Sequence, residues 1–183
     1  ELAGRSNNTV MPHTSHSRDM FDECRRRFID EGRTLIKLKH PNVVRCRDLF
    51  EANETAYLVM DFEEGLSFDV LLKSLEGQGG HYTESQLLFV AIRLAEGLEY
   101  VHQQNVLHRD IKPGNIFIRR LDNTPVLLDF GAAKQNFAEV SQSQAPFTEF
   151  YAPIDQLDTS SPPTAAIDIH AFGGLLYRAV TGN

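Results

Sequence analysis

The sequence has 183 residues, of which 42% are hydrophobic and 23% are charged, a balance typical of a globular protein with an apolar core. Its formal net charge of −7 argues against a surface built to coat nucleic acid or an anionic membrane. Two cysteines, Cys24 and Cys46, are too few for a disulfide framework or a cysteine-based metal site, and they favour a reducing, cytoplasmic environment. No apolar run approaches the roughly 20 residues that span a bilayer, so we expect no membrane contact within this segment.

The first third of the chain predicts a polar start, one helix and two strands. Residues 1–19 are rich in Ser, Asn, His and Thr, which is typical of a mobile connection. Apolar side chains at near-helical spacing predict an amphipathic helix from Met20 to Lys39. The sequence His40-Pro41-Asn42 ends this helix, because the residue before a proline disfavours the helical backbone. Two runs of strand-forming residues follow, at 43–50 and 55–62.

The remainder predicts mostly helix. A short helix is expected at residues 67–75, and a longer one begins after Thr83, which can form a capping box with Gln86. The apolar stripe of the longer helix consists of Leu87, Ala91, Leu94, Leu98 and Val101. Two short strands and a final helix are expected at 115–118, at 126–128 and from Ala166. This order of elements indicates an α+β protein in two lobes, and the helical pattern that runs into the last residue indicates a piece of a longer polypeptide.

One run of polar residues, His-Arg-Asp-Ile-Lys-Pro-Gly-Asn at 108–115, carries the strongest chemical signal. Phosphoryl transfer needs a carboxylate that orients the attacking hydroxyl, a cation near the transferred phosphate and an oxygen ligand for magnesium. Asp110, Lys112 and Asn115 supply these three groups in order. A plain polar loop is the alternative for any one of these residues, but eight residues in this order argue against it.

A second signal is Asp129-Phe130-Gly131, which follows the apolar run Val126-Leu127-Leu128. A carboxylate at the end of a buried strand, followed by glycine, can reach a divalent cation with few steric limits. Asp129 lies 14 residues after Asn115 and across one hairpin. The two oxygen ligands can therefore converge on one metal site.

Taken together, these motifs resemble a known family. The runs HRDIKPGN, LLDFG, TEFYAPIDQ and DIHAFG resemble the C-terminal lobe of a eukaryotic-like (Hanks-type) serine/threonine protein kinase. The upstream runs RRFIDEGRTLIKLKHPNVVRCRDLF and TAYLVMDFEEG resemble a helix and strand of its N-terminal lobe and the hinge, and FEANETAYLVMDFEEG is closer to bacterial members.

The resemblance covers residues 20–183 and implies a two-lobed kinase-like fold that is truncated at both ends. A partial N-lobe would occupy residues 1–62, with a linker, the glutamate-bearing helix and the strands that lead to the hinge. A partial C-lobe would occupy residues 63–183, with the catalytic loop, the metal-binding Asp-Phe-Gly, the activation segment and the start of a central helix.

The resemblance also implies a role for each catalytic residue. Asp110 would be the catalytic base, and Lys112 would steady the γ-phosphate of ATP. Arg109 would bind a phosphate or an acidic group on the activation segment. Asn115 and Asp129 would hold two Mg²⁺ ions.

Five further residues would bind the nucleotide by the same resemblance. Glu31 would pair with the lysine of the third strand, and Met60 would occupy the gatekeeper position beside the adenine. The backbone of Asp61 and Glu63 would hydrogen-bond the adenine edge. Phe117 would pack beneath the adenine ring.

Other positions are implied to act around the catalytic loop rather than in it. Asp168 matches the aspartate that braces the catalytic loop from beneath, and Thr148 matches the threonine of the substrate-docking loop. Ser141 and Ser143 lie in the activation segment, and we predict one of them as the autophosphorylation site that Arg109 would read.

Two functions remain open from the sequence. The first is ATP-dependent phosphorylation of serine and threonine hydroxyls on protein substrates, which the intact catalytic residues favour. The second is a catalytically impaired, pseudokinase-like module that binds nucleotide or signalling partners. A small-molecule phosphotransferase is a third reading, against which Lys112 and residues 151–155 argue. The glycine-rich loop and the strand-three lysine are absent from these residues and are expected upstream, so the chain by itself should be a poor catalyst.

Overall fold

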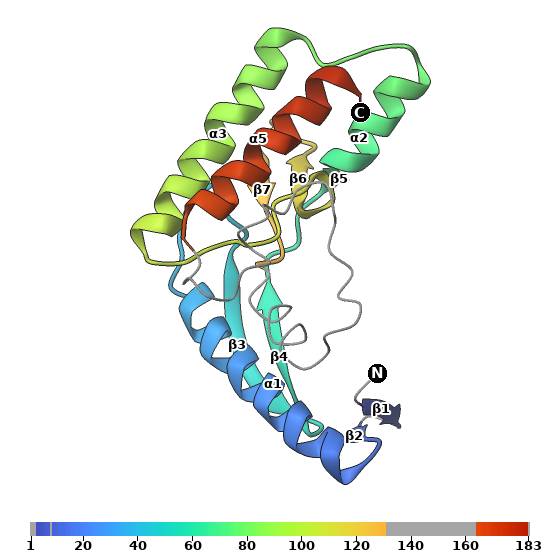
Figure 1. Ribbon diagram of the computed structural model, residues 1–183, viewed down its shortest axis with the longest axis vertical. Helices are drawn as coiled ribbons and strands as arrows, with labels where there is room; N and C mark the ends of the chain where they lie inside the picture. The colour runs from blue at the N-terminus through green and yellow to red at the C-terminus, as the bar shows by residue number, and fades with distance from the viewer. Residues whose placement is uncertain (1–2, 8, 131–163, 183) are drawn as a thin grey trace. The chain divides into compact units, whose positions relative to one another are not determined.

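The computed structural model describes residues 3–7, 9–130 and 164–182, so the activation-segment residues Ser141, Ser143 and Thr148 lie outside the described residues. The described residues mix strands and helices along the chain, as an α+β protein requires (Figure 1). They divide into a first unit within residues 1–39 and 45–61 and a second unit that contains residues 40–44, 62–130 and 164–182. No helix in the described part of the chain is long and apolar enough to cross a membrane.

The first unit begins with a hairpin of two antiparallel strands, β1 (Ala3–Ser6) and β2 (Thr9–Pro12). Asn7 in the turn has a φ of 53°, a left-handed conformation that asparagine tolerates better than most residues. The N–H of Val10 donates to the carbonyl of Asn53 at 3.0 Å, which ties the hairpin to the rest of the unit. Where the structure describes this segment, the predicted mobile connection is wrong: residues 3–6 and 9–12 form strands, and residues 15–19 belong to a helix. Strands of four residues are too short to show a recognisable alternation of apolar and polar side chains.

The helix α1 (Ser15–Leu35) begins earlier than the predicted Met20 and ends before Lys39. It begins at Ser15 because the hydroxyl of Thr14 accepts a hydrogen bond from the N–H of Ser17 at 3.0 Å and so caps the first turn. Five polar residues, 15–19, thus belong to the helix, and its apolar side chains begin only at Met20.

Two antiparallel strands, β3 (Cys46–Ala52) and β4 (Thr55–Met60), complete the first unit. Asn53 and Glu54 both have positive φ, of 54° and 60°, which is the geometry of a two-residue hairpin turn. The predicted first strand at 43–50 is wrong in its first residues. Val44 belongs to the second unit, where its N–H donates to the carbonyl of Leu127 at 2.9 Å.

The second unit combines a small sheet with three helices. Its elements are β5 (Gly65–Ser67), α2 (Phe68–Gly77), α3 (Glu84–Gln103), the short 3₁₀ helix η1 (Pro113–Asn115), β6 (Ile116–Arg119), β7 (Pro125–Leu127) and α5 (Ala166–Thr181). The strands form an antiparallel sheet in the order β5-β6-β7, and α3 and α5 run side by side (Figure 1). The largest fully buried apolar side chains are Phe68, Leu94, Leu98, Ile111, Ile116, Leu127 and Leu175.

The predicted start of the long helix is confirmed. The hydroxyl of Thr83 accepts from the N–H of Gln86 at 3.3 Å, and the side chain of Gln86 accepts from the N–H of Thr83 at 3.0 Å. Leu94, Leu98 and Val101 of the predicted stripe are buried, whereas the first two positions of the stripe are only half-buried. The second half of the predicted stripe, toward the C-terminus of α3, is therefore the part that packs into the core.

Gly65 lies where β5 meets β6, and its lack of a side chain is required there. A Cβ atom at this position would lie 2.0 Å from the carbonyl oxygen of Ile118, which is backbone and cannot rotate away. We expect Gly65→Ala to lower the free energy of unfolding by about 1–3 kcal/mol or more, as overpacking does. Thermal and urea denaturation measure this loss.

Gly77→Ala is the matched control, because a Cβ at Gly77 would meet nothing within 4 Å. This change should leave stability within about 1 kcal/mol of wild type or raise it slightly, since alanine restricts the unfolded chain. An unchanged melting temperature for Gly65→Ala would contradict the close approach of the two backbones.

Candidate active site

The segment between α3 and β6 brings Asp110, Lys112 and Asn115 together. The ammonium group of Lys112 donates to both carboxylate oxygens of Asp110, at 3.1 and 2.9 Å. The amide nitrogen of Asn115 donates to a carboxylate oxygen of Asp110 at 2.8 Å and to its backbone carbonyl at 2.9 Å. The Asp110 side chain is 19% exposed, so the carboxylate is held in place and still open to solvent.

Asn115 and Asp129 present oxygen atoms of the kind that Mg²⁺ prefers. Both hydrogen bonds that Asn115 makes to Asp110 use its amide nitrogen, so its amide oxygen points away from Asp110. The carbonyl of Asn115 accepts from the N–H of Leu128 at 2.9 Å, which places it one residue from Asp129 along the neighbouring chain segment. Asp129 has a φ of 53° and lies at the surface of the unit.

This donor set fits a magnesium ion better than a tightly caged metal. Within the described residues, no group of three or more His, Cys, Asp or Glu side chains could hold a metal ion. Mg²⁺ commonly takes one or two protein oxygens and completes its shell with water and substrate phosphates. One amide oxygen and one carboxylate match that pattern.

Asp168, in the first turn of α5, braces the segment at residues 108–115, which is the expected catalytic loop. Its carboxylate is 0% exposed and accepts hydrogen bonds from the backbone N–H groups of His108 (2.8 Å) and Arg109 (2.7 Å). Arg109 has a φ of 64°, an unfavourable backbone conformation that persists only where the surroundings fix it. The predicted brace is confirmed, and it acts on the two residues that precede Asp110.

His108 links the catalytic loop to the Asp-Phe-Gly segment. The imidazole is fully buried, and this burial lowers the pKa of His108, so the ring is neutral. Its Nε2 lies 2.9 Å from the carbonyl of Leu128, which can only accept, so Nε2 carries the proton. The ring also packs against Phe130, with centroids 4.6 Å apart. His108 therefore acts in packing and orientation rather than in proton transfer.

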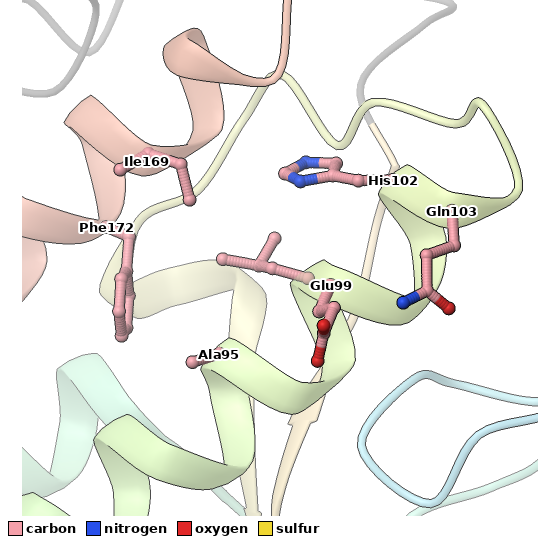
Figure 2. Close-up of a pocket in the computed structure, with 7 residues that line it drawn as sticks. Ala95, Glu99, His102, Gln103, Ile169 and Phe172 are labelled. Carbon is pink, nitrogen blue, oxygen red and sulfur yellow. The ribbon is translucent and has the colours of Figure 1, made fainter.

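His102, in the last turn of α3, was not singled out by the sequence. Its Nε2 lies 2.8 Å from the same Asp168 oxygen that accepts from His108. His102 also lines a hollow of about 460 Å³ (Figure 2), whose other walls come from Ala95, Glu99 and Gln103 of α3 and from Ile169 and Phe172 of α5. A histidine near the C-terminus of a helix ordinarily indicates only a favourable dipole interaction, so the sequence held no signal for this contact.

The residues expected at the nucleotide fall in both units. Glu31, Met60 and Asp61 belong to the first unit, and Glu63 and Phe117 belong to the second. Glu31 and Phe117 are half-buried, and Met60 is exposed.

The backbone of Asp61 is partly committed within its own unit. Its N–H donates to the carbonyl of Arg45 at 2.8 Å, so a ligand would meet its carbonyl rather than its N–H. The carboxylate of Asp61 accepts hydrogen bonds from Nε and Nη2 of Arg47, at 2.5 and 2.7 Å. Any contact of Asp61 with an adenine edge would therefore use the main chain.

The fold and the catalytic loop define a protein kinase domain. The model of the family described as protein kinase domain matches residues 6–183, which is nearly the whole chain. The chain belongs to the protein kinase family.

Its relatives are serine/threonine kinases from animals and bacteria. The chain is 34% identical to serine/threonine-protein kinase Nek1 of Mus musculus over 163 residues, covering 88% of this chain and 13% of the relative. It is 33% identical to serine/threonine-protein kinase B of Synechocystis, covering 90% of this chain and 29% of the relative. For serine/threonine-protein kinase pkn2 of Myxococcus xanthus, the identity is 33%, and the match covers 94% of this chain and 21% of the relative. The chain thus spans less than a third of the length of these relatives.

Solved structures agree with this assignment and with the predicted kinase-like fold. The apo form of PpkA-294 superposes with a TM-score of 0.86 and 28% identity, covering 100% of this chain and 63% of that chain. Rad53 in complex with AMP-PNP gives a TM-score of 0.67 and 26% identity, covering 84% of this chain and 37% of that chain.

Proposed function

We propose that this chain is the part of a serine/threonine protein kinase that transfers the γ-phosphoryl group of ATP to hydroxyl groups of protein substrates. The observation that carries the proposal is the convergence of Lys112 and Asn115 on the carboxylate of Asp110. A carboxylate held by two donors and still accessible can orient one further group, which here is the substrate hydroxyl.

In this proposal the residues of the catalytic loop act by position and charge. Asp110 would accept a hydrogen bond from the attacking hydroxyl and take its proton as the new oxygen–phosphorus bond forms, while the bond between the γ-phosphorus and the bridging oxygen breaks and ADP leaves. Lys112 places a positive charge beside Asp110, where it would stabilise the negative charge that builds up on the transferred group. Arg109, next to Asp110, would bind a phosphorylated or acidic residue of the activation segment.

Asn115 and Asp129 would hold the magnesium ions. Bound Mg²⁺ would neutralise part of the negative charge on the phosphates and hold them in a fixed orientation. Asn115 contributes its amide oxygen because Asp110 already occupies its amide nitrogen.

The nucleotide in this proposal is ATP. The Rad53 structure contains AMP-PNP, which supports an adenine nucleotide as the ligand of this fold. Glu31, Met60, Asp61, Glu63 and Phe117 are the proposed nucleotide-binding residues of this chain. We expect the domain to act in the cytoplasm, where ATP and protein substrates are both present.

Transfer of radiolabelled γ-phosphate by the full-length protein tests the function. We expect label on serine or threonine after acid hydrolysis, loss of transfer when EDTA removes magnesium, and collapse of transfer in Asp110→Asn. If the wild type transfers no phosphate and still binds ATP with magnesium, the second reading, a pseudokinase-like nucleotide-binding module, replaces the enzyme.

A further inference from the structure

The carboxylate of Glu63 is held by a single arginine on the neighbouring strand β6. Nε of Arg119 donates to one carboxylate oxygen at 2.6 Å, and Nη2 donates to the other at 2.7 Å. The third nitrogen of the guanidinium, Nη1, donates to the backbone carbonyl of Pro41 at 3.1 Å. One side chain thus joins three segments of the second unit that are far apart in the sequence.

This ion pair differs from the exposed pairs elsewhere on the protein. The side chains of Glu63 and Arg119 are 13% and 28% exposed, whereas Arg33 and Asp30 on α1 form a pair that is 67% and 65% exposed. Exposed pairs contribute little because water competes for both charges. A two-pronged arginine–carboxylate pair that is largely shielded from water is both stronger and more directional.

The backbone around Glu63 is fixed by the same strand. The N–H of Arg120 donates to the carbonyl of Glu64 at 2.8 Å, and Gly65 pairs with Arg119 in the β5–β6 register. Phe62, by contrast, is 88% exposed. The Arg119–Glu63 pair adds a side-chain contact to this backbone pairing, two residues before β5 begins.

We propose that Arg119 is a positioning residue for nucleotide binding. It acts by fixing the main chain of Glu63. This inference rests on the proposed function, in which the backbone of Glu63 binds the adenine edge. Because Arg119 acts through Glu63 and is not part of the catalytic loop, its loss weakens nucleotide affinity and leaves the chemical step unchanged. Removal of an ion pair that only stabilised the fold would not weaken nucleotide affinity while leaving the rate of the chemical step unchanged.

The test is a double-mutant cycle in the full-length protein with Arg119→Ala, Glu63→Gln and the two changes combined. We expect each single change to raise the KM for ATP and the Kd for ADP with magnesium by about five- to ten-fold, as loss of a charged hydrogen-bonded pair does. The value of kcat at saturating ATP should stay within about two-fold of wild type. The double variant should be no worse than either single variant, because both remove the same interaction.

Arg120→Ala is the matched control, since it removes the neighbouring positive charge and leaves the Arg119–Glu63 pair intact; its KM should equal that of wild type. Arg119→Lys keeps the charge without the two-pronged geometry and should give an intermediate KM. If Arg119→Ala does not fold, as judged by its melting curve, Glu63→Gln and Arg119→Lys carry the same test.

Two negative results are distinguishable. A wild type that transfers phosphate, with variants whose KM and Kd are unchanged or whose kcat falls instead, overturns the role of Arg119 and leaves the proposed function standing. A wild type that neither transfers phosphate nor binds ADP overturns the proposed function, and the role of Arg119 with it.

Discussion

Asp110→Asn is expected to lower kcat by about 10²- to 10⁴-fold, the range that a positioned general base contributes. Asparagine has nearly the same size, but its uncharged amide cannot take the hydroxyl proton. Its NH₂ group also cannot accept hydrogen bonds, whereas Lys112 and Asn115 together donate to both oxygens of the native carboxylate. Steady-state phosphorylation of a protein substrate by the full-length kinase measures the loss.

The KM for ATP should change little in Asp110→Asn, because this residue acts on the hydroxyl and not on the adenine. Asp122→Asn is the matched control, an equivalent substitution in the exposed turn between β6 and β7, where Asp122 accepts from the N–H of Thr124. Asparagine can accept the same bond, so the rate should stay within about two-fold of wild type. A wild-type rate in Asp110→Asn would show that another group orients the hydroxyl.

Asp168→Ala is expected to have the largest combined effect on stability and activity. The change leaves the buried N–H group of His108 and the partly buried N–H group of Arg109 without their acceptor. Each unsatisfied buried donor costs about 1–3 kcal/mol, so the free energy of unfolding should fall by about 3 kcal/mol or more. The kcat should also fall by at least about ten-fold, because a displacement of the loop by a fraction of an ångström misplaces Asp110.

Asp168→Asn separates the two effects. The amide keeps one oxygen acceptor and the native volume, but its NH₂ group must face either the N–H of Arg109 or the side shared by His108 and His102. We therefore expect a smaller loss of stability than for alanine, with kcat still reduced. Denaturation curves and kinase assays of the same preparations measure both, and a normal kcat in both variants would exclude a role for the brace in catalysis.

The sequence predicted the parts of this protein that depend on neighbouring residues. Asp110, Lys112 and Asn115 lie within one short loop, so their order along the chain already limits how far apart their side chains can be. The Thr83–Gln86 capping box was predictable for the same reason, because its hydrogen bonds span three residues. The resemblance to kinases added the brace by Asp168, which no local pattern indicates.

The short strands β6 and β7 lie within one residue of their predicted positions, but three other short strands were missed. The β1–β2 hairpin and the three-residue strand β5 are stabilised by pairing with other strands rather than by their own sequence. Val44 shows the same limit: it continues an apolar run into β3, yet it belongs to the second unit, where its backbone pairs with Leu127.

Only the tertiary structure revealed the contacts that fix the candidate site from a distance. His102 and Asp168 are separated by 66 residues, and Glu63 and Arg119 by 56. Separations of this length do not indicate which of the chain's charged residues contact one another, so neither pair could be identified from the sequence. Strand register and helix packing decide which side chains meet, because a shift of one residue in a strand turns every side chain to the opposite face.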